Sequence, residues 1–242
     1  MNFPLQHQRA LVTGASSGIG RAIAIALAQS GCSVALVGRS LDKLDALAAE
    51  IEETPGSAQV YCLDLSQVDT IGSAIQPIIN AFGVPDILVN SAGIAHTRPL
   101  LDTSLSDWRQ ALDLNLTSVF EVAKAVLPGM RSQGRGTILN IASVAARQVF
   151  PNWGLYCVTK AALVAFSQAL ALEERPHGIR VTVLSPGSVN TPLWDTDTVD
   201  ADFDRSLMLT PDIVAQAALQ AILLPPSAVI TEMTLLPSVG VF

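Results

Sequence analysis

The sequence of 242 residues has few charged and few aromatic side chains, which make up 14% and 5% of it. Its basic residues are outnumbered, and the net charge of −7 argues against a general nucleic-acid-binding surface. No uninterrupted apolar run reaches the roughly 18 residues of a membrane span. The first residues, MNFPLQHQR, lack a basic segment followed by a long apolar one. We therefore expect no signal peptide, no membrane association and a cytoplasmic location.

Cysteine and histidine are also scarce, with three of each. The cysteines are odd in number and widely spaced, so they predict neither a disulfide framework nor a metal site. The histidines do not have metal-ligand spacing, which disfavours the mechanism of zinc-dependent alcohol dehydrogenases. We expect no metal in this protein.

Half of the residues are apolar, and they are grouped in a regular order along the chain. Runs rich in Val, Ile and Leu predict strands at 9–13, 33–38, 58–63, 86–90, 136–142, 179–185 and 228–236. Amphipathic stretches between them predict helices at 18–30, 41–53, 67–82, 104–132, 155–174 and 211–223. Strict alternation of strands and helices, with apolar strands, predicts an α/β fold around a parallel sheet.

The first strand leads into a glycine-rich turn and an alanine-rich helix. Gly14, Gly18 and Gly20 have the spacing G-x-x-x-G-x-G. Such glycines allow a tight turn and a close approach of the backbone to a pyrophosphate, which the N-terminus of the next helix attracts. This pattern predicts a dinucleotide site.

The second strand ends at Gly38 and Arg39, where a carboxylate would favour the ribose of NAD. An arginine offers a bidentate guanidinium to a 2′-phosphate, so NADP(H) is favoured over NAD(H). Ser16 and Ser40 could add hydroxyl contacts. The alternative is that Arg39 is an ordinary solvated side chain.

Two further strands end in polar or small residues. Asp64 follows the third strand and could contact the adenine or cap the next helix. Asn90, Ala92 and Gly93 follow the fourth strand and would lie beside the cofactor, although a plain turn would look the same.

Tyr156 and Lys160 are four residues apart on a predicted helix, so their side chains share a face. In a sheltered cleft, the ammonium would lower the pKa of the phenol and make it usable in proton transfer at neutral pH.

The ordered motifs TGASSGIG (13–20), Asp64-Leu65, NSAG (90–93), Asn115, Ser143, Tyr156-x-x-x-Lys160 and SPGSVNT (185–191) resemble the short-chain dehydrogenases/reductases. The resemblance covers essentially the whole chain. It implies a single-domain, Rossmann-like three-layer α/β/α sandwich over residues 1–242, with a seven-stranded parallel sheet. It also implies NAD(P)(H)-dependent interconversion of alcohols and carbonyls.

The resemblance also implies residue roles. Tyr156 would exchange a proton with the substrate oxygen, Ser143 would orient that oxygen, Lys160 would hold the nicotinamide ribose, and Asn115 would kink its helix and anchor a water. The implied cofactor-binding residues are Gly14, Ser16, Ser17, Gly18, Ile19, Gly20, Arg39, Asp64, Leu65, Asn90, Ala92, Gly93, Tyr156, Lys160, Pro186, Gly187, Val189 and Thr191.

The favoured function is that of an NADP-dependent carbonyl reductase. One alternative is the reduction of 3-oxoacyl thioesters, although the C-terminal ITEMTLLPSVGVF lacks the glycine-rich stretch with an aspartate that many family members have. Another alternative is a non-catalytic NADP(H) sensor, which would not need Ser143, Tyr156 and Lys160.

A long irregular stretch is predicted to form a lid at about 188–210. It holds five aspartates, which either disfavour anionic substrates or simply solvate the loop, and its apolar residues Trp194, Phe203, Leu207 and Met208 could form walls. Phe150 and Trp153 could line the opposite side. The substrate is expected to be a small neutral or apolar carbonyl compound.

The predicted helices 104–132 and 155–174 carry apolar residues on more than one face, and the tail 234–242 is also apolar. Such surfaces predict contacts between subunits. We expect a homo-oligomer, either a tetramer or a dimer.

Overall fold

A seven-stranded, wholly parallel sheet forms the centre of the protein in a computed structural model that describes residues 3–240. The strand order is β3-β2-β1-β4-β5-β6-β7. The strands are β1 (Arg9–Thr13), β2 (Ser33–Gly38), β3 (Ser57–Cys62), β4 (Ile87–Asn90), β5 (Gly136–Ile141), β6 (Ile179–Pro186) and β7 (Glu232–Leu235). The predicted seven-stranded Rossmann-like sheet is thereby confirmed.

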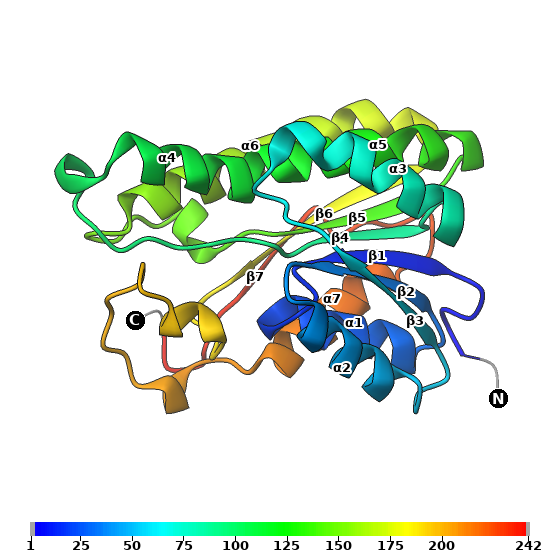
Figure 1. The fold of residues 1–242 in the computed structure, drawn as a ribbon, viewed down its shortest axis with the longest axis horizontal. Coiled ribbons are helices and arrows are strands. Elements are labelled where there is room, and N and C mark those ends of the chain that lie inside the picture. The colour runs from blue at the N-terminus through cyan, green and yellow to red at the C-terminus, as the bar shows by residue number, and fades with distance from the viewer. Residues whose placement is uncertain (1–2, 241–242) are drawn as a thin grey trace.

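Helices cover both faces of the sheet and complete the three layers (Figure 1). One face carries α1 (Gly18–Gln29), α2 (Leu41–Ile51) and α7 (Pro211–Ile222), and the other carries α3 (Ile71–Phe82), α5 (Ser118–Gln133) and α6 (Gly154–Glu174). Neighbouring residues of β1 point to opposite faces, as they must in a strand. Ala10 and Val12 pack in the core beneath α1 and α7, whereas Leu11 packs in the core beneath α3 and α5.

The predicted helix over 104–132 is present as one helical run from Leu105 to Gln133, and a π-helical segment interrupts its regular geometry at Asn115. The structure has α4 (Leu105–Leu112), a π-helical segment (Asp113–Thr117) and then α5. The last strand is shorter than the predicted 228–236, while the other strands match their predicted ranges within one residue at each end. Of the apolar tail 234–242, residues 241 and 242 lie outside the described part of the chain.

Within residues 3–240, one helical stretch, Gly154–His177, is long and apolar enough to cross a membrane by length and composition alone, with a mean hydropathy of 1.5. It contains α6, which lies against the sheet. Leu163 and Val164 of α6 are buried against Val183 of β6 and Val119 of α5. Packing inside the domain therefore accounts for its apolar composition.

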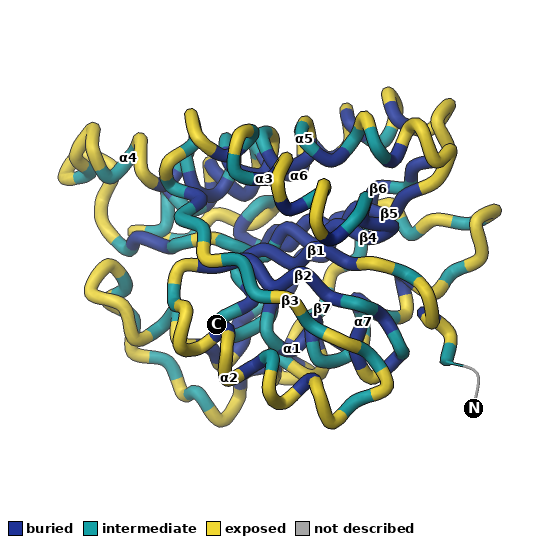
Figure 2. The backbone as a smooth tube through the Cα atoms, turned by 45° about the vertical axis from the view of Figure 1, so that its right-hand side comes forward, coloured by how far each residue is buried: buried dark blue, intermediate teal, exposed yellow. Residues whose placement is uncertain are grey.

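The order of the strands changes direction between β1 and β4. From β1 the chain continues to β2 on one side, and from β4 it continues to β5 on the other. Open α/β sheets bind ligands at the carboxyl ends of strands at such a point, because the loops diverge there. The buried strands run towards a rim of more exposed loops (Figure 2).

Candidate active site

One large cleft of about 1070 Å³ lies at this rim. Its nucleotide half, as we call it here, is lined by the turn 14–19, residues 38–43 and the loop 91–94. Its substrate half is lined mainly by Phe150, Trp153, Tyr156, Trp194 and Phe203. Ser143 and Lys160 also line the cleft.

The glycine turn of the nucleotide half depends on the absence of side chains. Gly14 has φ of +66°, and a Cβ there would lie 2.8 Å from the backbone N and Cα of Ala92. Gly18 has φ of +55° and faces the side chain of Thr191. A Cβ on Gly20 would collide with the carbonyl of Gly14, so this glycine serves the packing of the turn and does not line the cleft.

The helix after this turn presents free donors to the cleft. Ser17 precedes α1 and makes no side-chain cap to it. The first N–H groups of a helix have no partner within the helix, and they carry the positive end of its dipole. The turn and the start of α1 therefore suit a pyrophosphate.

Two cations lie at the far end of the nucleotide half. Arg39 and Lys43 both line it and both are exposed, and neither forms an ion pair in the described part of the chain. Ser16 and Ser40 line the same region, as expected. The sequence analysis missed Lys43. Its position in the first turn of α2 was a usable signal, because the helix dipole disfavours a cation there.

Asp64 does not reach the cleft. Its carboxylate accepts hydrogen bonds from the backbone N–H and the hydroxyl of Ser66, at 3.0 and 2.9 Å, and so closes a turn. Its neighbour Leu65 does line the cleft. Of the two interpretations of Asp64, the geometry favours the local structural one.

The loop after β4 is held in place by buried polar side chains. The Asn90 amide donates to Oδ1 of Asn140 at 2.8 Å, and Asn90 itself lies below the cleft surface. Thr13 Oγ1 accepts from the N–H groups of Ser91 and Ala92, at 3.1 and 3.3 Å. Ala92 and Gly93 consequently stand at the cleft surface.

Asn115 lies at the centre of the π-helical segment and is 1% exposed. Its Oδ1 accepts from the N–H of Ile94 at 2.8 Å, and its Nδ2 donates to the carbonyl of Ile94 and to Thr159 Oγ1 at 2.9 and 3.0 Å. These bonds tie the loop after β4 to α6. Asn115 does not line the cleft, and its proposed role in holding a water remains a prediction.

Tyr156 and Lys160 project from the N-terminal part of α6 into the cleft. The Lys160 ammonium donates to the carbonyl of Ile141 at 2.9 Å and lies 5.7 Å from the centre of the Tyr156 ring. Ser143 follows β5, and its hydroxyl accepts from the N–H of Ala145 at 3.1 Å. The end of β5 and the first turns of α6 thus place Ser143, Tyr156 and Lys160 in one cleft.

The expected effect of Lys160 on the phenol is not found. Burial raises the pKa of Tyr156 to about 12, against a lowering contribution from its hydrogen bond with Ser143. Burial also lowers the pKa of Lys160 to about 8. The enclosure that was expected to strengthen their attraction removes water from both groups, and this desolvation dominates. The phenol is therefore protonated at neutral pH.

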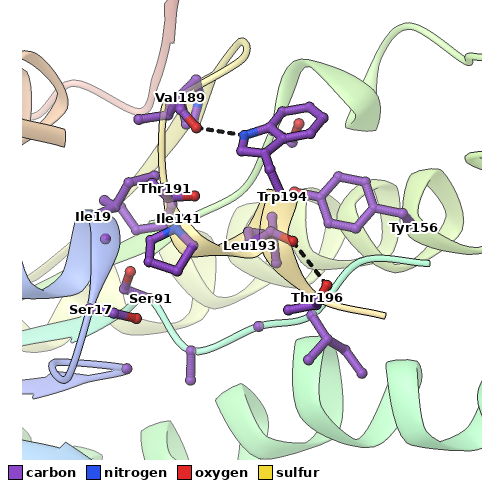
Figure 3. A pocket seen from close by; sticks show the side chains of 18 of the residues that line it. Ser17, Ile19, Ser91, Ile141, Tyr156, Val189, Thr191, Leu193, Trp194 and Thr196 are labelled. Carbon is purple, nitrogen blue, oxygen red and sulfur yellow. Dashed lines mark hydrogen bonds between the residues drawn. The ribbon is translucent and has the colours of Figure 1, made fainter. Parts of the chain in front are cut away.

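The C-terminal end of β6 forms another part of the wall. Pro186, Gly187, Val189 and Thr191 all line the cleft. They lie between the turn of α1 and the lid, and Figure 3 shows Val189 and Thr191 on the same side of the cleft as Ser17 and Ile19. This segment borders both halves.

The lid segment 188–210 is held together internally by Arg205 and is joined to the loop after β4 by Thr198. Arg205 donates to Asn190 Oδ1 at 2.8 Å, to Asp195 at 2.9 Å and to the carbonyl of Thr191 at 3.0 Å. Thr198 pairs with the loop after β4: its carbonyl accepts from the N–H of Thr97 at 2.9 Å.

None of the five lid aspartates lines the cleft, and all are exposed. Asp195 pairs with Arg205, and Asp204 caps a short 3₁₀ turn. Of the walls predicted from this segment, Trp194 and Phe203 line the cleft, whereas Leu207 is exposed and Met208 is buried elsewhere. Solvation of the loop accounts for the aspartates.

Among residues 3–240, no group of three or more His, Cys, Asp or Glu side chains is placed to hold a metal ion. The fold and the cleft are those of a dinucleotide-dependent oxidoreductase: a glycine turn at the switch point of a parallel sheet, with Tyr156 and the buried Lys160 in the same cleft.

Comparison with known proteins agrees with this class. The family model for short chain dehydrogenases matches residues 8–201. An uncharacterised oxidoreductase of Staphylococcus epidermidis is 36% identical over 94% of this chain and 96% of its own length. D-threitol dehydrogenase of Mycolicibacterium smegmatis is 38% identical over 90% of this chain and 86% of its own.

Solved structures show the same likeness. An alcohol dehydrogenase of the archaeon Thermococcus sibiricus, in complex with 5-hydroxy-NADP, is 30% identical, with a TM-score of 0.86 over 94% of this chain and 95% of that one. The protein belongs to the short-chain dehydrogenase family. It is accordingly an oxidoreductase of that family.

Proposed function

We propose that the protein transfers hydride between NADP(H) and a carbonyl or alcohol substrate, with Tyr156 as general acid and base. The observation that carries this proposal is the convergence of Ser143, Tyr156 and Lys160 on one cleft that also contains the glycine turn. A purely nucleotide-binding sensor would have no need of that convergence.

The residues of the nucleotide half fit a dinucleotide. Gly14 lets the turn lie against the backbone of Ala92, where a Cβ would collide, and the free N–H groups of α1 suit the pyrophosphate. Arg39 and Lys43 would hold a 2′-phosphate, which is the reason for preferring NADP(H). When bound, this cofactor supplies or accepts the hydride.

In the reduction, the Tyr156 hydroxyl donates its proton to the carbonyl oxygen as the carbon receives hydride. A phenol that keeps its proton at neutral pH is ready for this direction. The Ser143 hydroxyl hydrogen-bonds the same oxygen and orients it. Lys160 holds positive charge beside the phenol and stabilises the phenolate that remains, because opposite charges attract strongly where water is excluded.

Turnover of carbonyl compounds by the purified protein tests this proposal, with NADPH oxidation as the readout. Tyr156→Phe removes only the reacting hydroxyl, so we expect kcat to fall by about 10²- to 10⁴-fold. NADPH affinity should change little. Tyr61→Phe is the matched control, because its hydroxyl bonds only to Gln59 on the edge strand β3. A Tyr156→Phe variant with undiminished turnover would refute the assignment.

The proposal extends to subunit assembly. Phe120 of α5 and Val158 and Leu172 of α6 are large apolar side chains that are 44%, 41% and 65% exposed. Apolar residues on this outer face support contacts between copies of the chain. We expect a dimer or tetramer in light scattering, and a single monomeric species contradicts this.

A further inference from the structure

We infer that the substrate half of the cleft selects a neutral ketone that carries an aromatic ring next to the carbonyl. This inference rests on the proposed function and names the substrate class of the same site. It is carried by the composition of the walls, the state of their polar groups and the charges around them.

Aromatic residues are concentrated at this one place. The chain has only seven Phe, three Trp and two Tyr, and five of these line the substrate half: Phe150, Trp153, Tyr156, Trp194 and Phe203. The two hydrophobic cores beneath the helices are almost wholly aliphatic. Aromatic side chains are thus used where a ligand is to be contacted.

The rings form a continuous wall that begins at the catalytic tyrosine. Trp153 meets Tyr156 edge to face at 5.6 Å between ring centres, Trp194 meets Trp153 at 5.7 Å, and Phe203 meets Trp194 at 5.4 Å. A substrate whose oxygen is at Tyr156 therefore has its substituent against these rings, where another ring can join the same edge-to-face pattern.

The polar atoms of this half already have partners. The Trp194 N–H donates to the carbonyl of Val189 at 2.7 Å, and the Thr196 hydroxyl donates to the carbonyl of Leu193 at 2.9 Å (Figure 3). Ser188 has an unpartnered hydroxyl, but it lies just after β6, between Gly187 and Val189, which are implied to bind the cofactor. A polyol or a sugar would leave its extra hydroxyls unpaired against these walls, which disfavours such substrates.

The charged groups around the pocket disfavour two other classes of substrate, carboxylates and organic cations. Arg205, the cation of the lid, is taken up by Asn190, Asp195 and the carbonyl of Thr191, so it does not receive a carboxylate. An organic cation could stack on the aromatic rings, but the Lys160 ammonium lies 5.7 Å from the Tyr156 ring and repels it. A neutral aryl ketone meets neither obstacle.

The experiment compares 1-phenylethanone with 1-cyclohexylethanone, which has the same skeleton without a π face. The ratio of their kcat/KM values in wild type is divided by the ratio in Trp194→Leu, so that the intrinsic reactivity of each ketone cancels. We expect this double ratio to be about 5-fold, which corresponds to the loss of one aromatic pair. Trp194→Phe keeps a ring without the N–H and should preserve most of the selectivity.

Trp108→Leu makes the same change in α4, outside the cleft, so it is the matched control and should leave the ratio unchanged. An unchanged ratio in Trp194→Leu overturns the inference. So does a preference for a tetritol, for a trimethylammonium ketone or for benzoylformate, which adds a carboxylate to the aryl ketone.

A binding measurement separates this inference from the proposed function. In isothermal titration of the protein with NADP⁺ bound, 1-phenylethanone should bind more tightly than 1-cyclohexylethanone, and neither ketone can react with the oxidised cofactor. If no carbonyl compound is turned over but this difference is seen, the proposed function fails and the inference about the pocket stands. If ketones are reduced without aryl selectivity, the reverse holds. This measurement on wild type also decides the matter if Trp194→Leu does not fold.

Discussion

The nucleotide half of the cleft is built largely from backbone groups and glycines, whereas the substrate half is built from large side chains. The turn at Gly14 and Gly18 belongs to one stretch of eight residues, 13–20, that runs from the end of β1 into the start of α1. The aromatic wall is assembled from α6, the residues before it and the lid. A ligand with an invariant part, such as a pyrophosphate, can be bound by a local backbone motif, while a particular substrate requires side chains from several segments.

The sharpest test of this comparison is Gly14→Ala. The new Cβ would lie 2.8 Å from the backbone of Ala92, so the turn must shift away from the position that a dinucleotide needs. We expect kcat/KM for NADPH to fall about 100-fold, as small misplacements can cause. Steady-state kinetics at saturating carbonyl substrate measures this.

Gly134→Ala is the matched control for strain. Gly134 has φ of +64°, close to that of Gly14, but a Cβ there has nothing within 4 Å. It should lower the free energy of unfolding by about 1–2 kcal/mol without altering cofactor kinetics. Equal effects of the two substitutions on the KM for NADPH would show that the close approach to Ala92 is unimportant.

Arg39→Ala tests side-chain recognition within the nucleotide half. Loss of a charge-assisted hydrogen bond should raise the KM for NADPH about 30-fold and leave that for NADH nearly unchanged. Lys43→Ala should act in the same direction with a smaller effect, because a lysine makes one point contact where arginine makes two.

Arg175→Ala, close to the amino end of β6 and so remote from the cleft, is the control and should affect neither cofactor. If Arg39→Ala weakens both cofactors equally, the 2′-phosphate is bound elsewhere.

The smallest effect expected concerns pH, at the junction of the two halves. The pKa of Lys160 is lowered by burial to about 8, so this group loses its charge as the pH rises through that value. The stabilisation of the Tyr156 phenolate is lost with it. From pH 7 to 9, kcat/KM for the reduction should fall about 10-fold.

The Lys160→Arg variant keeps its positive charge across this pH range. Its kcat/KM should therefore not change between pH 7 and 9, although it is lower than the wild-type maximum. Lys124→Met, on the exposed side of α5, should retain the wild-type profile. A wild-type profile that stays level up to pH 9 is incompatible with Lys160 as the titrating group.

Much of this architecture could be predicted because it is encoded locally. Apolar runs bounded by turns fixed six strands within one residue at each end, and the spacing of the glycines located the nucleotide half. The family resemblance placed an irregularity of the helix over 104–132 at Asn115, but no local pattern could predict the bonds from Asn115 to Ile94 and Thr159, which are distant in sequence. The role of Asp64 also could not be decided from the sequence, because its local partner, Ser66, competes with any ligand for the carboxylate.

The sequence by itself determined the parallel α/β fold, the glycine turn and the identity of the Ser143, Tyr156 and Lys160 set, because periodicity and motif spacing are properties of short segments. Only the tertiary structure decided which side chains face the substrate and how the Tyr–Lys pair titrates. Both depend on what surrounds a group once the chain has folded. Burial raises the pKa of Tyr156 and lowers that of Lys160, and no pattern along the chain measures burial at that site.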